Sequence, residues 1–137
     1  MHVFTYGSLM FDPVWAHVVR GRYASRAGEI SGFRRYAVRD VTYPGVVERA
    51  GAQVAGRLYL DVDDEDLQRL DRFEGAQYRR IVVDVATRGS DGQPERLPAG
   101  LYLFLPTERL LDGDWDPQRF EREDMGRFLV RHGAGAD

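Results

Sequence analysis

Residues 53–62 alternate between two kinds of side chain with the period of a β-strand. Positions 54, 56, 58, 60 and 62 are apolar or glycine, and the intervening positions include arginine, tyrosine and aspartate. Such alternation is typical of a strand with one face against a core and the other toward solvent. Residues 78–87 repeat the pattern, and the apolar run at residues 101–105 predicts a buried strand. We therefore expect a fold built mainly from strands.

A helix is expected directly after the first of these strands. Residues 61–66 are rich in aspartate and glutamate but lack the spaced ligands and central glycine of a calcium loop. Asp63 as the N-cap, with acidic residues in the first turn, explains the cluster through capping and the helix dipole. Gly75 supplies a left-handed residue that ends the helix.

Glu74 lies on the face of this helix that should be apolar. Leu67, Leu70 and Glu74 occupy positions i, i+3 and i+7, which share one side of a helix. An inward carboxylate loses hydration, so its pKa rises and it becomes a candidate proton acceptor near neutral pH. A glutamate in a last turn can instead turn out to water, or pair with Arg79 or Arg80.

The N-terminus predicts a strand, a tight loop and a second helix. Residues 3–6 are good strand formers, and Gly7 and Ser8 suit a loop whose glycine takes a positive φ. Asp12 is placed as N-cap and Pro13 at the first helical position. Loops of this kind expose backbone amides that can bind an anion, although many contain glycine and serine for steric reasons only.

The remaining third predicts one more strand and a C-terminal helix. The polar segment containing Pro94 and Pro98 is expected to form an exposed hairpin after the turn at residues 89–92. Asp116-Pro117 should start a helix whose aromatic side, including Phe120 and Phe128, packs on the sheet. We expect one domain over residues 1–132 and a disordered tail over residues 133–137.

Composition excludes several classes of function. The net charge of -3 gives no general attraction to nucleic acid or anionic membranes, and the arginine pairs at 34–35 and 79–80 are interpreted as solvated strand faces. The absence of cysteine excludes disulfides and thiolate nucleophiles, and three scattered histidines make a metal site improbable. No apolar run approaches the ~20 residues of a membrane span, so a cytoplasmic location is expected.

An ordered set of segments resembles the gamma-glutamylcyclotransferase-like family, particularly its AIG2-like branch. These segments are VFTYGSLM at 3–10, GFRRY at 32–36, YPGVV at 43–47, VAGRLYLDV at 54–62 and LDRFEGAQYRR at 70–80. The resemblance implies an α+β fold, a small mixed β-barrel with flanking helices. It also implies that the loop formed by Tyr6, Gly7, Ser8 and Leu9 grips a glutamyl group through backbone amides, with Glu74 as the acid/base. Family members acting on gamma-glutamyl amino acids tend to have asparagine where this chain has Leu9, which puts the substrate in doubt.

The implied activity is release of 5-oxoproline from a gamma-glutamyl amine or gamma-glutamyl amino acid by intramolecular cyclisation, without a cofactor. Tyr78 and Tyr43 would orient the ligand or cap the mouth of the barrel. Asp71 is either a second acid or an accessory hydrogen-bonding group. Ser8 is disfavoured as a nucleophile because no neighbouring base or Gly-x-Ser-x-Gly elbow accompanies it. The alternatives are a non-catalytic module that binds small anions in the same loop, and a protein-interaction domain; the leaving group and oligomeric state are open.

Overall fold

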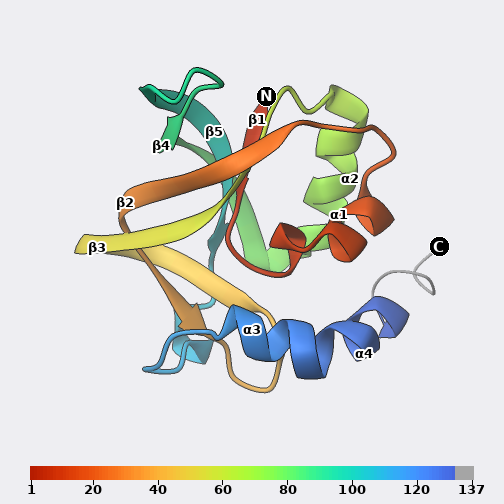
Figure 1. Cartoon of the computed structure of the whole chain (residues 1–137). Helices are drawn as coiled ribbons and strands as arrows, with labels where there is room; N and C mark the ends of the chain where they lie inside the picture. Colours follow the sequence, from red (N-terminus) through yellow and green to blue (C-terminus); the bar gives the residue numbers. More distant parts are fainter. Residues whose placement is uncertain (132–137) are drawn as a thin grey trace.

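The computed structural model, which describes residues 1–131, shows a closed barrel of five strands with helices on its outside (Figure 1). The strands are β1 (His2–Thr5), β2 (Ser25–Ala37), β3 (Pro44–Tyr59), β4 (Tyr78–Arg88) and β5 (Pro94–Phe104), in the spatial order β1-β3-β2-β4-β5. Neighbouring strands are antiparallel except β1 and β5, which are parallel. The predicted mixed barrel of α+β class is confirmed, whereas the tail expected over residues 133–137 lies outside the described residues.

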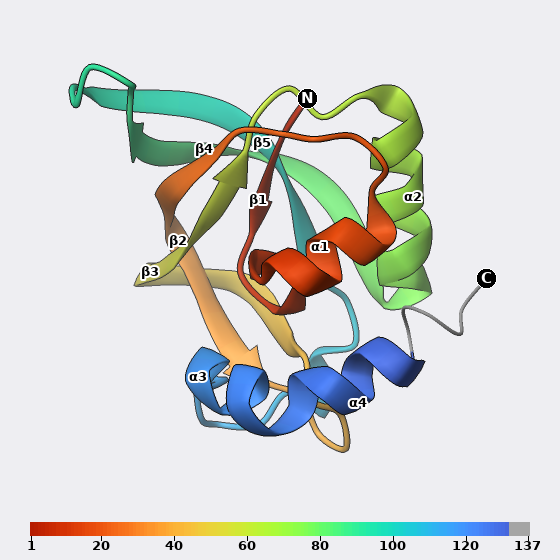
Figure 2. The same cartoon turned by 45° about the vertical axis from the view of Figure 1, so that its right-hand side comes forward.

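The helices cover two parts of the barrel (Figure 2). Helix α1 (Asp12–Val18) contacts α2 (Asp64–Glu74) on one side. The C-terminal segment runs across the lower end of the barrel in both views, as α3 (Pro117–Arg119), a π-helical turn (Phe120–Asp124) and α4 (Met125–Leu129). Short 3-10 turns at Ser8–Met10, Gly75–Gln77 and Thr107–Arg109 connect the other elements.

Two apolar cores follow from the alternation along the strands. The interior of the barrel is filled by residues that include Phe4, Leu58 and Leu101. A second core between barrel and helices includes Tyr59, whose ring stacks on Trp15 with centroids 3.6 Å apart. Tyr59 belongs to the face of the strand that we expected to meet solvent, and it is buried because α1 packs there.

The expected exposed hairpin around Pro94 and Pro98 is confirmed, but strand β5 begins at Pro94, earlier than the strand expected over residues 101–105. Both prolines lie in β5, opposite Arg88 and Asp84 of β4. Strand β1 pairs with β5 only at Ala99 and Gly100, so the two prolines have no ladder partner on that side. A strand edge tolerates proline because no amide donor is needed there.

The predicted N-caps are confirmed for α2 and α3, whereas α1 begins one residue earlier than predicted. The Asp63 side chain accepts a hydrogen bond from the Asp66 amide at 2.8 Å, and Asp116 caps α3. For α1 the N-cap is Phe11, and Asp12 is the first helical residue without a side-chain cap. Gly75 ends α2 with φ 77°, but its ψ of -164° is extended rather than left-handed helical.

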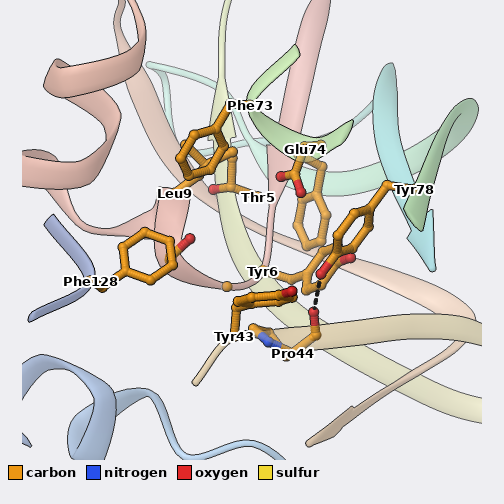
Figure 3. Close-up of a pocket in the computed structure, with 12 residues that line it drawn as sticks. Thr5, Tyr6, Leu9, Tyr43, Pro44, Phe73, Glu74, Tyr78 and Phe128 are labelled. Carbon is orange, nitrogen blue, oxygen red and sulfur yellow. Dashed lines mark hydrogen bonds between the residues drawn. The ribbon is translucent and has the colours of Figure 1, made fainter. Parts of the chain in front are cut away.

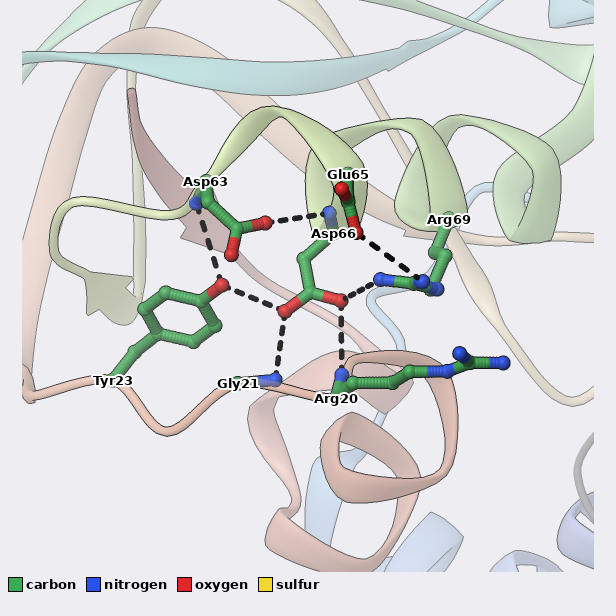
Figure 4. A network of polar contacts seen from close by, with 7 residues as sticks. All are labelled: Arg20, Gly21, Tyr23, Asp63, Glu65, Asp66 and Arg69. Carbon is green, nitrogen blue, oxygen red and sulfur yellow. Dashed lines mark hydrogen bonds and ion pairs between the residues drawn. The ribbon is translucent and has the colours of Figure 1, made fainter.

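Asp66 attaches α2 to the chain that follows α1 (Figure 4). Its carboxylate is 1% exposed and accepts hydrogen bonds from the Arg20 and Gly21 amides at 2.9 and 2.8 Å, from the Tyr23 hydroxyl at 2.6 Å and from Arg69 at 2.7 Å. Burial alone would raise the pKa of Asp66, but these donors lower it to about 2. Asp66 therefore orients the helix that carries Glu74 at its other end.

Candidate active site

A cavity of about 90 Å³ opens where β1 ends and α2 ends (Figure 3). The structure brings all six site residues expected from the sequence to its wall. The complete lining consists of Phe4, Thr5, Tyr6, Gly7, Ser8, Leu9, Tyr43, Pro44, Phe73, Glu74, Tyr78 and Phe128. Residues from the N-terminal loop, the start of β3, the end of α2 and the C-terminal helix thus meet at one place.

Glu74 is the last residue of α2, and its side chain points into the cavity (Figure 3). Within residues 1–131 its carboxylate makes no hydrogen bond or ion pair, so it pairs with neither Arg79 nor Arg80. Burial, followed by the nearby negative charge of Asp71, raises the pKa of Glu74 to about 8. A side chain of this kind can exchange a proton near neutral pH.

Asp71 lies one turn before Glu74 and has an opposite character. Its carboxylate accepts two hydrogen bonds from Arg80, at 2.9 and 3.2 Å, and one from the Tyr102 hydroxyl at 2.7 Å. Burial would raise the pKa of Asp71, but the hydrogen bonds from Arg80 and Tyr102 lower it. Of the two roles considered for Asp71, the geometry supports the accessory ion-pair partner, and Arg80 is not a solvated cation.

The loop at residues 7–9 offers unused backbone donors to the cavity. Its 3-10 turn is closed by the amides of Met10 and Phe11, which donate to the carbonyls of Gly7 and Ser8 at 3.0 and 3.2 Å. The amides of residues 7, 8 and 9 themselves have no hydrogen-bond acceptor in the described part of the chain. Unpaired amides beside a cavity are suited to an anionic or polarised oxygen.

Gly7 is required by a close approach and not by a positive φ. Its φ is -129°, so the expected left-handed conformation was wrong. A Cβ at this position would lie 2.8 Å from the Cγ and Cδ atoms of Pro44. The loop is thus packed against the start of β3, which local sequence could not reveal.

The tyrosine hydroxyls in the wall are held by backbone oxygens or side chains. Tyr6 donates to the Tyr102 carbonyl at 2.6 Å, and Tyr78 donates to the Pro44 carbonyl at 2.8 Å. Tyr43 donates to the Gln77 side chain at 3.3 Å. Burial raises the pKa of both Tyr6 and Tyr78 well above the usual value. Tyr6 and Tyr78 are therefore neutral near pH 7, and their hydroxyls orient the wall beside Glu74.

Sequence reasoning missed several parts of this region. Phe73 and Phe128 close one side of the cavity, and Phe128 with Tyr43 also borders a neighbouring groove of about 520 Å³. Arg35, interpreted as a solvated residue, donates to the Tyr6 carbonyl at 3.0 Å. The aromatic face predicted for the C-terminal helix was the available signal for Phe128; nothing local indicated the contact of Arg35.

The described residues contain neither a cluster of metal-binding side chains nor a helix that could span a membrane. No group of three or more histidine, aspartate or glutamate side chains there is arranged to hold a metal ion. Among the same residues, no helix has the length and apolar character needed to cross a membrane.

Comparisons with known proteins agree with the fold. The chain is 29% identical over 131 residues to AIG2-like protein D of Arabidopsis thaliana, covering 94% of this chain and 85% of that protein. It is 28% identical over 130 residues to Protein AIG2 C of the same plant, covering 93% and 76%. Similar solved structures include an Arabidopsis thaliana protein determined in solution (TM-score 0.70, 22% identity, 95% and 86% covered) and a gamma-glutamyl cyclotransferase (TM-score 0.66, 17% identity, 98% and 81% covered).

The family described as "Gamma-glutamyl cyclotransferase, AIG2-like" matches residues 3–117, which include both motifs that line the cavity and all of the barrel except His2. This match covers most of the chain. The protein therefore belongs to the AIG2-like gamma-glutamyl cyclotransferase family.

Proposed function

We propose that the protein is an enzyme that releases 5-oxoproline from a gamma-glutamyl amine or gamma-glutamyl amino acid by intramolecular cyclisation. The observation that carries the proposal is that one cavity holds both the Glu74 carboxylate and the amides of residues 7–9, none of which has a hydrogen-bond partner among the described residues. One group can move a proton, and the others can hold an oxygen.

The proposed reaction needs one base. Glu74 accepts a proton from the substrate's α-ammonium, and the freed amine attacks the γ-carbonyl carbon to form the new C–N bond of a five-membered lactam. Glu74 gives this proton to the leaving nitrogen as the original C–N bond breaks. The ring nitrogen loses its second proton through Glu74 to the released amine, which leaves as an ammonium. Because amine and carbonyl belong to one molecule, the protein supplies orientation and proton transfer rather than a second reactant.

The loop amides serve the substrate's oxygen atoms. They either bind the α-carboxylate or stabilise the oxygen of the reacting carbonyl as it gains negative charge. Tyr43 and Tyr78 form the adjacent wall, where their rings are 6.4 Å apart. The aromatic wall excludes water from the folded substrate.

The second candidate is a module that binds a small anion without catalysis. It is favoured by the raised pKa of Glu74, because a neutral side chain does not repel an anion held by the loop. Formation of 5-oxoproline distinguishes the two functions. An enzyme forms 5-oxoproline, and a binding module does not.

The test is an assay of 5-oxoproline with a panel of gamma-glutamyl amines and gamma-glutamyl amino acids. Glu74→Gln should lower turnover at least about a hundredfold and retain the fold, as expected for loss of a positioned acid/base. Glu65→Gln is the matched control because Glu65 is an exposed residue on the same helix. A folded Glu74→Gln variant with full turnover would remove Glu74 from the reaction, and an inactive wild type that binds 5-oxoproline would support the second candidate.

A further inference from the structure

Arg35 is a charged side chain that contacts the backbone of the N-terminal loop. It lies on β2, and its Nη1 atom donates to the Tyr6 carbonyl at 3.0 Å. Its Nε atom donates to Asp114 at 3.1 Å, and the guanidinium lies 5.3 Å from the centre of the Trp115 ring. The side chain is 14% exposed, against 60% for Asp114, so the loop-facing end of this ion pair is sheltered.

Trp115, which packs against the Arg35 guanidinium, is held in place by contacts outside the N-terminal loop. Trp115 is buried, and its indole donates to the Thr42 carbonyl at 2.6 Å. Asp114 and Trp115 therefore hold the guanidinium from two sides while its remaining nitrogen reaches Tyr6. A planar guanidinium held in this way has little freedom to leave its acceptor.

The contact acts on Gly7 through the peptide bond. The Tyr6–Gly7 peptide is planar and trans, so its carbonyl and its N–H point in opposite directions. A cation fixed on the Tyr6 oxygen thus fixes the direction of the Gly7 amide, which is one of the three unpaired donors of the loop. Donation to the carbonyl also polarises the peptide and strengthens the N–H as a donor.

We propose that Arg35 is a positioning residue of the active site, which holds the Tyr6–Gly7 peptide so that the Gly7 amide meets an anionic oxygen of the bound molecule. The inference rests on the proposed function for the identity of that molecule, a gamma-glutamyl compound or its 5-oxoproline product. It predicts that Arg35 affects binding at the loop and leaves the proton transfer at Glu74 intact.

The neighbouring Arg34 provides a matched control. It donates to the Asp112 carbonyl at 3.2 Å and lies 4.4 Å from the centre of the Tyr36 ring, and it makes no hydrogen bond to the loop at residues 6–9. Arg34→Met and Arg35→Met remove the same charge from adjacent positions of one strand. Only the second removes a donor from the Tyr6 carbonyl.

The experiment is a titration of each protein with 5-oxoproline, followed by the ¹H–¹⁵N signal of Gly7. The wild type and Arg34→Met should respond at the same concentrations, whereas Arg35→Met should need about tenfold more, the scale for loss of one charge-assisted hydrogen bond. Arg35→Lys should be intermediate because an ammonium cannot bridge Asp114 and Tyr6 in one plane. In turnover, Arg35→Met should raise KM and leave the acid limb of kcat in place.

The possible failures can be told apart. Equal affinities and Gly7 responses in wild type and Arg35→Met would overturn the role of Arg35, whatever the activity. A wild type that binds 5-oxoproline at Gly7, with the expected loss in Arg35→Met but no turnover, would overturn the proposed function alone. A wild type without a Gly7 response would overturn the inference even if turnover is present. If Arg35→Met does not fold, Asp114→Asn should weaken binding in the same direction, and unchanged binding there would count against the inference.

Discussion

Asp71 and Glu74 lie one helical turn apart at the end of α2, and within residues 1–131 only Asp71 has hydrogen-bond and ion-pair partners. Arg80 and Tyr102 hold the Asp71 carboxylate, so it stays ionised beside the cavity. Glu74 is half-buried next to this charge, and loss of hydration together with the charge raises its pKa to about 8. Helix α2 thus carries a carboxylate with a structural role, Asp71, and one that can exchange a proton with a ligand, Glu74.

The pH dependence of turnover should separate the free enzyme from the complex. Glu74 must be ionised to accept a proton, so activity rises with pH through its pKa, which is about 8 before substrate binds. A bound ammonium favours the carboxylate and lowers that pKa. We expect the acid limb of kcat/KM to break at higher pH than the acid limb of kcat. Coincident limbs near the ordinary glutamate value would mean that Glu74 is solvated.

Replacing Asp71 should shift the same acid limb. Asp71→Asn keeps the shape of the side chain and removes the charge that disfavours ionised Glu74. The limb of kcat/KM should move to lower pH but stay above the ordinary glutamate range, because burial is the larger cause of the shift. Asp84→Asn, an exposed position on β4, removes the same charge and should not move the limb. An unmoved limb in Asp71→Asn would show that the two carboxylates do not interact.

Gly7→Val should impair ligand binding more than folding stability. The added side chain meets the ring of Pro44, and the loop can relieve this contact by shifting, which displaces its amides. Titration with 5-oxoproline and urea denaturation would measure the two effects. Gly113→Val is the control because a Cβ at Gly113 has open space around it. Normal binding by Gly7→Val would show that the loop is only a turn.

Asp66→Asn should destabilise the protein by about 3 kcal/mol, the scale for breaking a buried ion pair. The asparagine cannot satisfy the donors from Arg20, Gly21, Tyr23 and Arg69 together. Asp64→Asn, an exposed substitution in the same helical turn, should cost much less. Urea denaturation at neutral pH would compare them, and equal losses would remove the special role of Asp66.

Local sequence was sufficient for several elements and for six of the residues that reach the cavity. Period-two alternation identified β4 and the second half of β3, and the Asp63 cap with Gly75 bracketed α2, whereas β2 and the first half of β3 were not predicted. The i, i+7 spacing of Leu67 and Glu74 placed the carboxylate on the inward face. These features depend on backbone periodicity and on interactions between residues close in sequence, so they can be predicted from the sequence alone.

The partners of the charged groups were decided only by the tertiary structure. Arg35 reaches Asp114 across 79 positions of sequence, and Arg80 is drawn to Asp71 rather than to Glu74. Likewise, Gly7 is limited by Pro44 instead of by its own φ. Closure of the barrel sets these neighbours, because the distance between side chains on different strands depends on register and packing. The sequence by itself therefore determined six of the residues that face the cavity, whereas the fold added the rest of the wall and decided which groups remain free to act.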